Sequence, residues 1–170
     1  YKSVEGTLDW YCVDHWSREL GLDIVLLKQE VDHLIAVHPH VLEFLGALQQ
    51  IGKRRVLVTN AHQKSLQLKL QKTRLSGYLD AVISSHDVGL PKEDPRFWAA
   101  LQEMVQFDPA RTLFVDDSLS VLRSARQYGI AWLLGISLPD STQPRRDEHE
   151  FPAIQDFSVL LGDLSKLSGN

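Results

Sequence analysis

Short apolar runs alternate with helical patterns along most of this chain, and this alternation restricts the fold more than any other feature. The apolar runs cover residues 55–58, 81–84, 112–115 and 130–136. Each has the length of a buried strand, and helical patterns separate them. Strands and helices that alternate at these lengths form parallel βαβ units with right-handed crossovers. The sequence therefore predicts an α/β fold with a Rossmann-like parallel sheet.

Helical patterns also occupy both ends of the chain. Residues 7–20 carry apolar side chains at helical spacing until Gly21, and a weaker helical run covers about residues 24–35. An amphipathic helix is predicted over residues 41–51. Residues 151–167 are expected to return as a short strand or turn followed by a terminal helix.

The step His38-Pro39-His40 is expected to end the helical first part of the chain. Proline moves the residue before it out of the helical region, and two histidines alone make a poor metal-ligand set. Two further segments, residues 87–95 and 139–150, are rich in turn formers and charges and are expected to be surface loops.

Composition narrows the class of protein. The chain has 170 residues, 44% of them hydrophobic and 24% charged, which fits one globular domain with a small appendage. No apolar run is long enough to span a bilayer. A net charge of −4 argues against a nucleic-acid partner. A single cysteine, Cys12, excludes an intrachain disulfide and a thiolate zinc cluster, so a cytoplasmic location is predicted.

Two adjacent carboxylates, Asp116 and Asp117, follow the third apolar run directly. Open α/β sheets bind ligands at the carboxyl ends of their strands. Two negative charges side by side at such a place are unfavourable unless a cation shares them, and Mg²⁺ is the natural partner of oxygen ligands. The alternative is that one aspartate caps the helix that begins near Ser118 while the other is solvated.

Polar groups at two other places complement this pair. Thr59 and Asn60 follow the first apolar run, and Lys92 lies in the loop after the second. A hydroxyl and backbone N–H groups at a strand end suit phosphate oxygens, and a lysine neutralises a transferring phosphoryl group. Together with a magnesium ion these groups predict a site for a small phosphate ester.

The ordered set Thr59-Asn60, Pro91-Lys92 and Asp116-Asp117 resembles motifs two, three and four of the haloacid-dehalogenase superfamily of phosphohydrolases. More narrowly, residues 8–12, 59–62, 91–94 and 111–118 are similar to a bacterial GMP/IMP nucleotidase subfamily. The resemblance implies a magnesium-dependent phosphatase that acts on a nucleoside 5′-monophosphate. It also implies that residues 1–38 are the later part of a helical cap and residues 39–170 the Rossmann-like core.

The same resemblance assigns roles to the motif residues. Thr59 would bind phosphoryl oxygens through its hydroxyl, helped by the Asn60 backbone, and Lys92 would bridge the phosphate and the nucleophilic carboxylate. Asp117 would be the direct metal ligand and Asp116 a second ligand or an outer acceptor.

The first motif of the family, Asp-x-Asp-Gly-Thr, has no counterpart in these residues. Its first aspartate would attack phosphorus to form an aspartyl-phosphate, and its second would act as the acid and base. The chain is therefore expected to be a fragment that lacks the central strand and is inactive alone. Without that strand, a gap or a substitute segment is expected between the strands that end at Thr59 and Asp116.

Substrate identity depends on the cap. Trp10, Tyr11 and Asp14 could contact a purine, although packing explains the aromatic residues equally well. His62 could approach the site or pack at a helix start. The alternatives to a nucleotidase are a non-catalytic relative that binds phosphate or protein, a sugar-phosphate phosphatase, a phosphomutase, and a 2-haloacid dehalogenase, which the aspartate pair disfavours.

Overall fold

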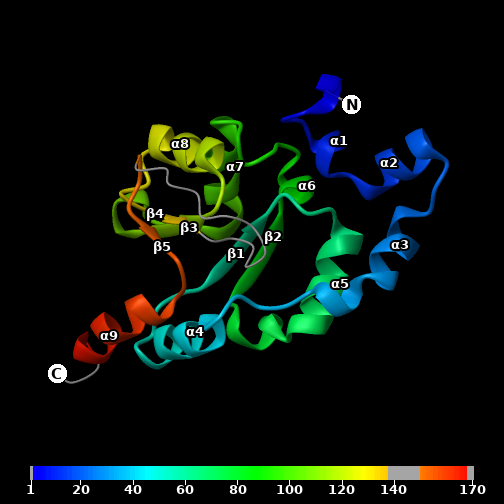
Figure 1. Cartoon of the computed structure of the whole chain (residues 1–170). Helices are drawn as coiled ribbons and strands as arrows, with labels where there is room; N and C mark the ends of the chain where they lie inside the picture. The colour runs from blue at the N-terminus through cyan, green and yellow to red at the C-terminus, as the bar shows by residue number, and fades with distance from the viewer. Residues whose placement is uncertain (1, 138–149, 168–170) are drawn as a thin grey trace.

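The structure is a computed structural model that describes residues 2–137 and 150–167. Parallel strands lie at its centre with helices around them (Figure 1). The strands are β1 (Val56–Thr59), β2 (Ala81–Ser84), β3 (Leu113–Asp116), β4 (Trp132–Ile136) and β5 (Ala153–Ile154). The helices are α1 (Leu8–Tyr11), α2 (Val13–Leu20), α3 (Ile24–Glu30), α4 (Val41–Gln50), α5 (Gln63–Thr73), α6 (Ser85–Val88), α7 (Arg96–Val105), α8 (Leu119–Tyr128) and α9 (Ser158–Leu167). The predicted α/β class is confirmed.

The strands form two separate parallel sheets within the described residues. β1 pairs only with β2, and β3, β4 and β5 form a second sheet in that order. β1 and β3 are not hydrogen-bonded to each other. The gap expected between the strands that end at Thr59 and Asp116 is therefore present, and each of the two strands has one edge without a strand partner.

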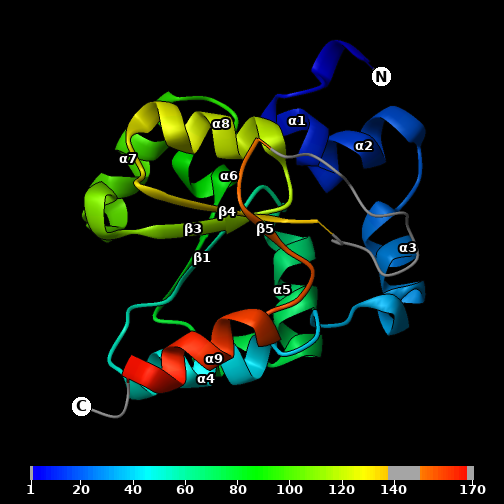
Figure 2. The same cartoon turned by 60° about the vertical axis from the view of Figure 1, so that its left-hand side comes forward.

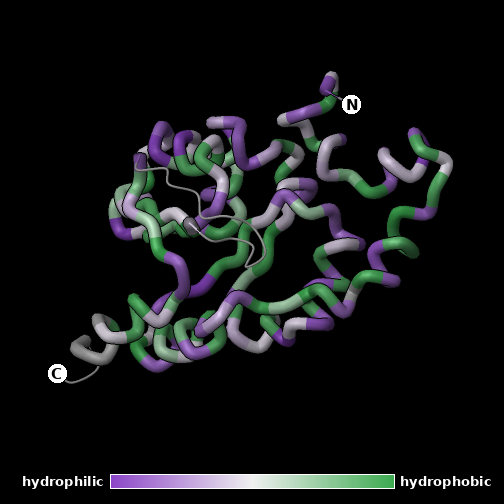
Figure 3. The backbone as a smooth tube through the Cα atoms, in the orientation of Figure 1, coloured by the Kyte–Doolittle hydropathy of each residue, from purple (hydrophilic) through white to green (hydrophobic). Residues whose placement is uncertain are grey.

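One hydrophobic core joins the two sheets. Its centre comes from α7 and α8, where Phe97, Trp98 and Val121 are almost fully buried. Val58 of β1 and Phe114 of β3 both pack against it. Figure 3 shows the strands of the interior in the hydrophobic colour. The shared core explains how two small sheets stay side by side without hydrogen bonds between them.

Arg55 and Asp80 fix the starts of β1 and β2. The Arg55 side chain donates hydrogen bonds of 3.1 and 2.8 Å to the two Asp80 carboxylate oxygens, and the Arg55 backbone N–H donates a third of 2.7 Å. These hydrogen bonds lower the pKa of the Asp80 carboxyl. The pair lies at the end of the sheet opposite Thr59, so it sets the register that brings Thr59 beside Ser84.

The first helical run differs from the prediction. Residues 7–20 do not form one helix, because Cys12 adopts an extended conformation between α1 and α2. The Cys12 thiol then accepts a 3.4 Å hydrogen bond from the His15 backbone and caps α2. The loop predicted from residue 87 is also shorter than expected, because Ser84 and Asp87 form a capping box that starts α6.

The remaining elements agree with the prediction made from the sequence. α1, α2 and α3 lie to one side of the sheets, with α3 packed against α5 (Figure 1). The C-terminal segment returns as β5 and α9, and α9 lies alongside α4 (Figure 2). The predicted loop at residues 139–150 falls outside the described residues except for Glu150. No helix in residues 2–137 and 150–167 is long and apolar enough to cross a membrane.

Candidate active site

The motif residues predicted to form the site come together in one cleft. It has a volume of about 680 Å³ and lies between the carboxyl ends of β1 and β3 and the helices α1–α3. Thr59, Asn60, Lys92, Asp116 and Asp117 all line it. The parallel arrangement of the strands explains this meeting, because it brings segments far apart in sequence to the same edge.

Lys92 and Asp116 form the central contact of the cleft. The Lys92 Nζ donates a 2.5 Å hydrogen bond to Asp116 Oδ2, and 10% and 7% of the two side chains are exposed. The other oxygen of Asp116 accepts a 2.9 Å hydrogen bond from the Ser118 backbone N–H at the start of α8. Asp116 therefore accepts a backbone hydrogen bond at the helix start, as one of the two alternatives required, and it also pairs with Lys92, which the sequence did not predict.

Asn60 holds the loop that carries Lys92. Its side-chain carbonyl accepts a 3.0 Å hydrogen bond from the Lys92 backbone N–H. Its amide nitrogen donates a 2.9 Å hydrogen bond to Glu93 Oε2. Asn60 is buried, so these hydrogen bonds are protected from water. The side chain of Asn60 thus positions Lys92, a role that the sequence did not predict.

Tyr11 connects the N-terminal helices to the same loop. Its hydroxyl donates a 2.6 Å hydrogen bond to Glu93 Oε1, so both carboxylate oxygens of Glu93 are used. Burial raises the pKa of the Tyr11 hydroxyl, and the adjacent Glu93 carboxylate raises it further. The hydroxyl therefore stays protonated and remains a donor over the ordinary pH range.

Thr59 is the last residue of β1, and its hydroxyl contacts the backbone two residues further along the chain. Its Oγ1 accepts a 3.1 Å hydrogen bond from the Ala61 backbone N–H. The hydroxyl proton has no acceptor among the residues that the structure describes. Thr59 can therefore donate to a ligand oxygen, as its predicted role requires.

The two aspartates suit a magnesium ion. Asp117 is exposed in the cleft, next to the buried Asp116. In residues 2–137 and 150–167 no group of three or more His, Cys, Asp or Glu side chains could hold a metal. Mg²⁺ commonly takes only one or two carboxylates from the protein and completes its coordination with water and substrate phosphate. The donor set here therefore fits Mg²⁺, with Asp117 more accessible than Asp116.

The three cap residues predicted to contact substrate lie in different places. Trp10 and Tyr11 line the cleft. The ring centroids of Trp10 and Trp16 lie 6.0 Å apart in an edge-on arrangement, so Trp10 also packs within the N-terminal helices. Asp14 is not among the cleft residues and instead pairs with Lys64 at 2.7 Å. The structure therefore does not bring Asp14 together with the other predicted site residues, and its contact with a substrate stays a prediction.

His62 lies at the start of α5. Its Nδ1 accepts a 3.4 Å hydrogen bond from the Lys64 backbone N–H. The ring centroids of His62 and His86 lie 5.0 Å apart, with the rings edge-on to each other. His62 also lines the cleft. Both possibilities considered for His62, packing at a helix start and proximity to the site, are therefore realised.

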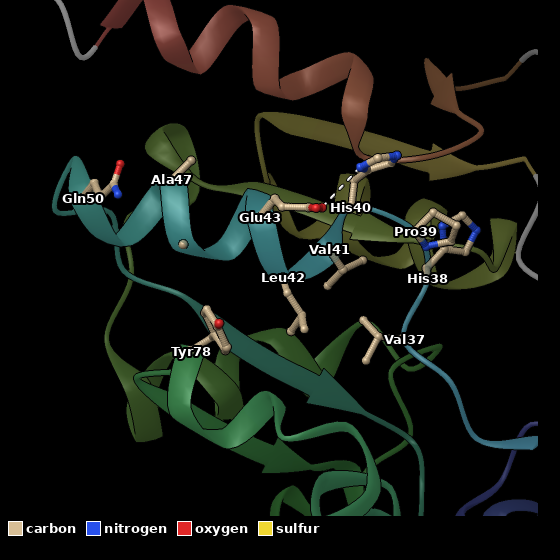
Figure 4. A pocket seen from close by; sticks show the side chains of 11 residues that line it. Val37, His38, Pro39, His40, Val41, Leu42, Glu43, Ala47, Gln50 and Tyr78 are labelled. Carbon is tan, nitrogen blue, oxygen red and sulfur yellow. Dashed lines mark ion pairs between the residues drawn. The ribbon is translucent and has the colours of Figure 1, made fainter. Parts of the chain in front are cut away.

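A second hollow of about 690 Å³ lies beside α4 (Figure 4). Val37, Leu42 and Tyr78 are among its lining residues, and His40 pairs with Glu43 at 3.2 Å at its rim. None of the motif residues lines it. It lies away from the strand ends that carry the predicted chemistry, so we assign the candidate site to the other cleft.

Glu93 is the residue that the sequence analysis missed. It follows Lys92 in a loop of turn formers, where an acidic side chain is ordinarily solvated. Its importance comes from Tyr11, 82 positions earlier. The only sequence signal was an acidic residue next to the motif lysine, and that signal does not indicate a distant partner.

A Rossmann-like fold with a threonine, a lysine and two aspartates in a cleft at its strand ends is typical of α/β enzymes, which bind their ligands at this edge of the sheet. Residues 7–129 match the family model for haloacid dehalogenase-like hydrolases. The chain is also 41% identical over 164 residues to the GMP/IMP nucleotidase YrfG of Escherichia coli. The chain belongs to the haloacid dehalogenase-like hydrolase family, as the motif resemblance predicted.

Other relatives are more distant. A phosphoglycolate phosphatase of Pseudomonas syringae pv. tomato is 28% identical over 161 residues. The crystal structure of a phosphatase of this superfamily from Thermococcus onnurineus superposes with a TM-score of 0.77 at 23% identity, over 96% of this chain and 75% of that one. This likeness confirms the fold. The chain covers 74% of the E. coli nucleotidase and 59% of the P. syringae phosphatase, while 96% and 94% of the chain itself is matched.

Proposed function

We propose that these residues form most of a magnesium-dependent phosphatase that hydrolyses nucleoside 5′-monophosphates with a 6-oxopurine base. The observation that carries the proposal is the convergence of Thr59, Lys92 and the Asp116-Asp117 pair in one cleft. The substrate class follows the similarity to a relative named GMP/IMP nucleotidase. The cleft volume of about 680 Å³ lies within the usual range for small-molecule sites.

Each of the motif residues in the cleft would have a different role in binding the phosphoryl group. The Thr59 hydroxyl donates to one phosphoryl oxygen. Lys92 uses one of its three N–H donors on Asp116, which leaves two for the phosphate. Asp117, with Asp116 behind it, would hold Mg²⁺, which when bound neutralises charge on the phosphoryl oxygens.

The nucleophile is proposed to come from outside the 170 residues. No Asp-x-Asp sequence occurs in them, and β1 and β3 each leave an edge unpaired at the gap between the sheets. A strand that pairs with both edges would place its carboxyl end between Thr59 and Asp116. An aspartate there would attack phosphorus, the leaving alkoxide would take a proton from the second aspartate, and water would hydrolyse the aspartyl-phosphate.

The helices before residue 39 are proposed to act as the later part of a cap over this site. α1 contributes Tyr11, and α2 and α3 contribute other walls of the cleft. Their division from residues 39–170 stays a prediction, as does the cytoplasmic location.

The test is phosphate release by the complete protein, including the segment that bears its Asp-x-Asp motif. With Mg²⁺ we expect faster release from GMP and IMP than from phosphoglycolate or sugar phosphates. Asp117→Asn and removal of the metal with a chelator are each expected to abolish it. Equal activity with and without the chelator would contradict the metal assignment, and a preference for sugar phosphates would contradict the substrate class.

A further inference from the structure

Two lysines lie in the cleft in addition to Lys92. Lys28 comes from α3 and Lys69 from α5, and both line the cleft that contains Thr59. Because α3 packs against α5, the two side chains are neighbours. Partial burial lowers the pKa of Lys28, and the nearby charge of Lys69 lowers it further. Within the described residues neither lysine forms an ion pair with a carboxylate. Two neighbouring cations without a counter-ion favour a ligand that is rich in acceptors.

The lysines are separated from the phosphoryl end of the cleft by part of α5. That helix starts at Gln63, immediately after the Thr59 segment, and Lys69 lies roughly 9 Å along its axis. Ser65 lies one turn before Lys69 on the same face. Ser65 is buried, lines the cleft, and its Oγ has no hydrogen-bond partner among the described residues. The cleft therefore has one polar group of α5, the Ser65 hydroxyl, between its phosphoryl end and the lysines.

Apolar side chains complete this end of the cleft. Trp16 and Leu20 of α2 and Ile24 of α3 line it beside Lys28. A flat aromatic ring can pack on such side chains while its polar edge reaches the ammonium groups. Apolar walls with a few polar groups at one edge are typical of sites for small organic ligands.

We infer that Lys28 and Lys69 form a base-recognition subsite that binds the O6 and N7 acceptors of a 6-oxopurine. This inference rests on the proposed function and identifies the residues that select its substrate. Lysine only donates hydrogen bonds. Guanine presents two acceptors, O6 and N7, on one edge, and hypoxanthine shares that edge, whereas adenine replaces O6 with an amino donor. A pair of donors therefore selects GMP and IMP over AMP.

The test compares substrates that share the phosphate but differ in the leaving group. In the complete protein with Mg²⁺, the double variant Lys28→Met/Lys69→Met is expected to raise the KM for IMP at least tenfold. Its kcat/KM for p-nitrophenyl phosphate is expected to stay within twofold of the wild type, and its kcat/KM for AMP, which keeps only the N7 acceptor, is expected to fall much less than that for IMP. Lys28→Arg/Lys69→Arg, which keeps both donors, is expected to restore most of the preference for IMP.

Lys64→Met is the matched control. Lys64 lies on the same helix as Lys69, is exposed, does not line the cleft and pairs with Asp14, so all three substrates should behave as in the wild type. An unchanged ratio of IMP to AMP activity in the double variant overturns the subsite while the proposed function stands. An equal loss on IMP and p-nitrophenyl phosphate also overturns it, because that loss indicates general damage. A wild-type protein that does not hydrolyse IMP overturns the proposed function and the subsite together.

Discussion

The ammonium group of Lys92 lies 2.5 Å from the carboxylate of Asp116, and both side chains are almost entirely buried. The two residues come from different sheets: Lys92 follows β2, and Asp116 ends β3. Their contact therefore bridges the gap between β1 and β3 at the carboxyl ends. A buried pair of this kind contributes to stability mainly because neither charge is left alone.

Lys92→Met is expected to lower the free energy of unfolding by about 3–5 kcal/mol, because it leaves the Asp116 carboxylate buried without a cation. Urea unfolding measures this loss. Lys92→Met/Asp116→Asn should recover part of it, since the second change removes the uncompensated charge. The matched control is Lys64→Met, whose exposed pair with Asp14 contributes about 0–1 kcal/mol. Equal losses in the two single variants would contradict the role of the buried pair.

Tyr11→Phe is expected to lower kcat/KM of the complete protein about tenfold, because it removes the donor that holds Glu93 and, through Asn60, the loop of Lys92. Phosphate release from p-nitrophenyl phosphate is a suitable measurement, since that substrate has no purine to contact the tyrosine. Tyr78→Phe is the control, because Tyr78 lines the hollow beside α4 and not the cleft. Wild-type kinetics for Tyr11→Phe would show that the contact does not position the loop.

Acid stability should depend on Asp80. Hydrogen bonds from Arg55 hold the pKa of the Asp80 carboxyl below its unfolded value, which is about 3.9. A depressed pKa contributes stability that is full above the unfolded value and is lost as the pH falls through the folded value. Between about pH 5 and pH 2, urea unfolding should therefore show a smaller loss of stability in Asp80→Asn than in the wild type.

Glu103→Gln is the control for this acid series, because Glu103 is exposed on α7 and forms no ion pair among the residues described. Its acid profile should match that of the wild type. If Asp80→Asn also has the wild-type profile, other carboxylates must account for the acid sensitivity.

Ser124→Ala tests the core that joins the two sheets. Trp98 is 1% exposed, and its Nε1 donates a 2.8 Å hydrogen bond to the Ser124 hydroxyl. Removing the acceptor leaves a buried donor unsatisfied, so the free energy of unfolding should fall by about 1–3 kcal/mol. Ser120→Ala on the exposed side of α8 should change it by less than about 0.5 kcal/mol. A loss for Ser124→Ala no larger than for Ser120→Ala would refute this account of the core.

Much of the fold was predictable because its signals are local. The apolar runs at β1, β2, β3 and β4 have the length of buried strands, and glycines or a proline mark several boundaries. The gap between β1 and β3 was also predictable, since the motif comparison identified which strand was absent. The break at Cys12 was not, because helical spacing continues through it and only the local backbone and the His15 N–H reveal the cap.

The candidate site was predictable in its motif residues but not in their contacts. Thr59, Lys92 and the aspartate pair follow strand ends, and a parallel sheet brings such ends together. The partner of Glu93 is Tyr11, and the neighbour of Lys69 is Lys28; both relationships depend on how α1 and α3 pack over the core. Packing between segments so distant in sequence leaves no periodic or spacing signal. The pairing of Asp14 with Lys64, 50 positions later, likewise has no signal in the sequence.

The central claim is that this chain holds the phosphate-binding and metal-binding parts of a phosphatase and needs an Asp-x-Asp strand in the gap between β1 and β3. The most direct measurement is Mg²⁺-dependent phosphate release from IMP by residues 1–170 alone and by the same residues joined to the strand-bearing segment. Circular dichroism and urea unfolding of both samples establish that residues 1–170 are folded. The account predicts release only from the joined protein, and its loss when the first aspartate is changed to asparagine. Turnover of IMP by residues 1–170 alone would contradict it.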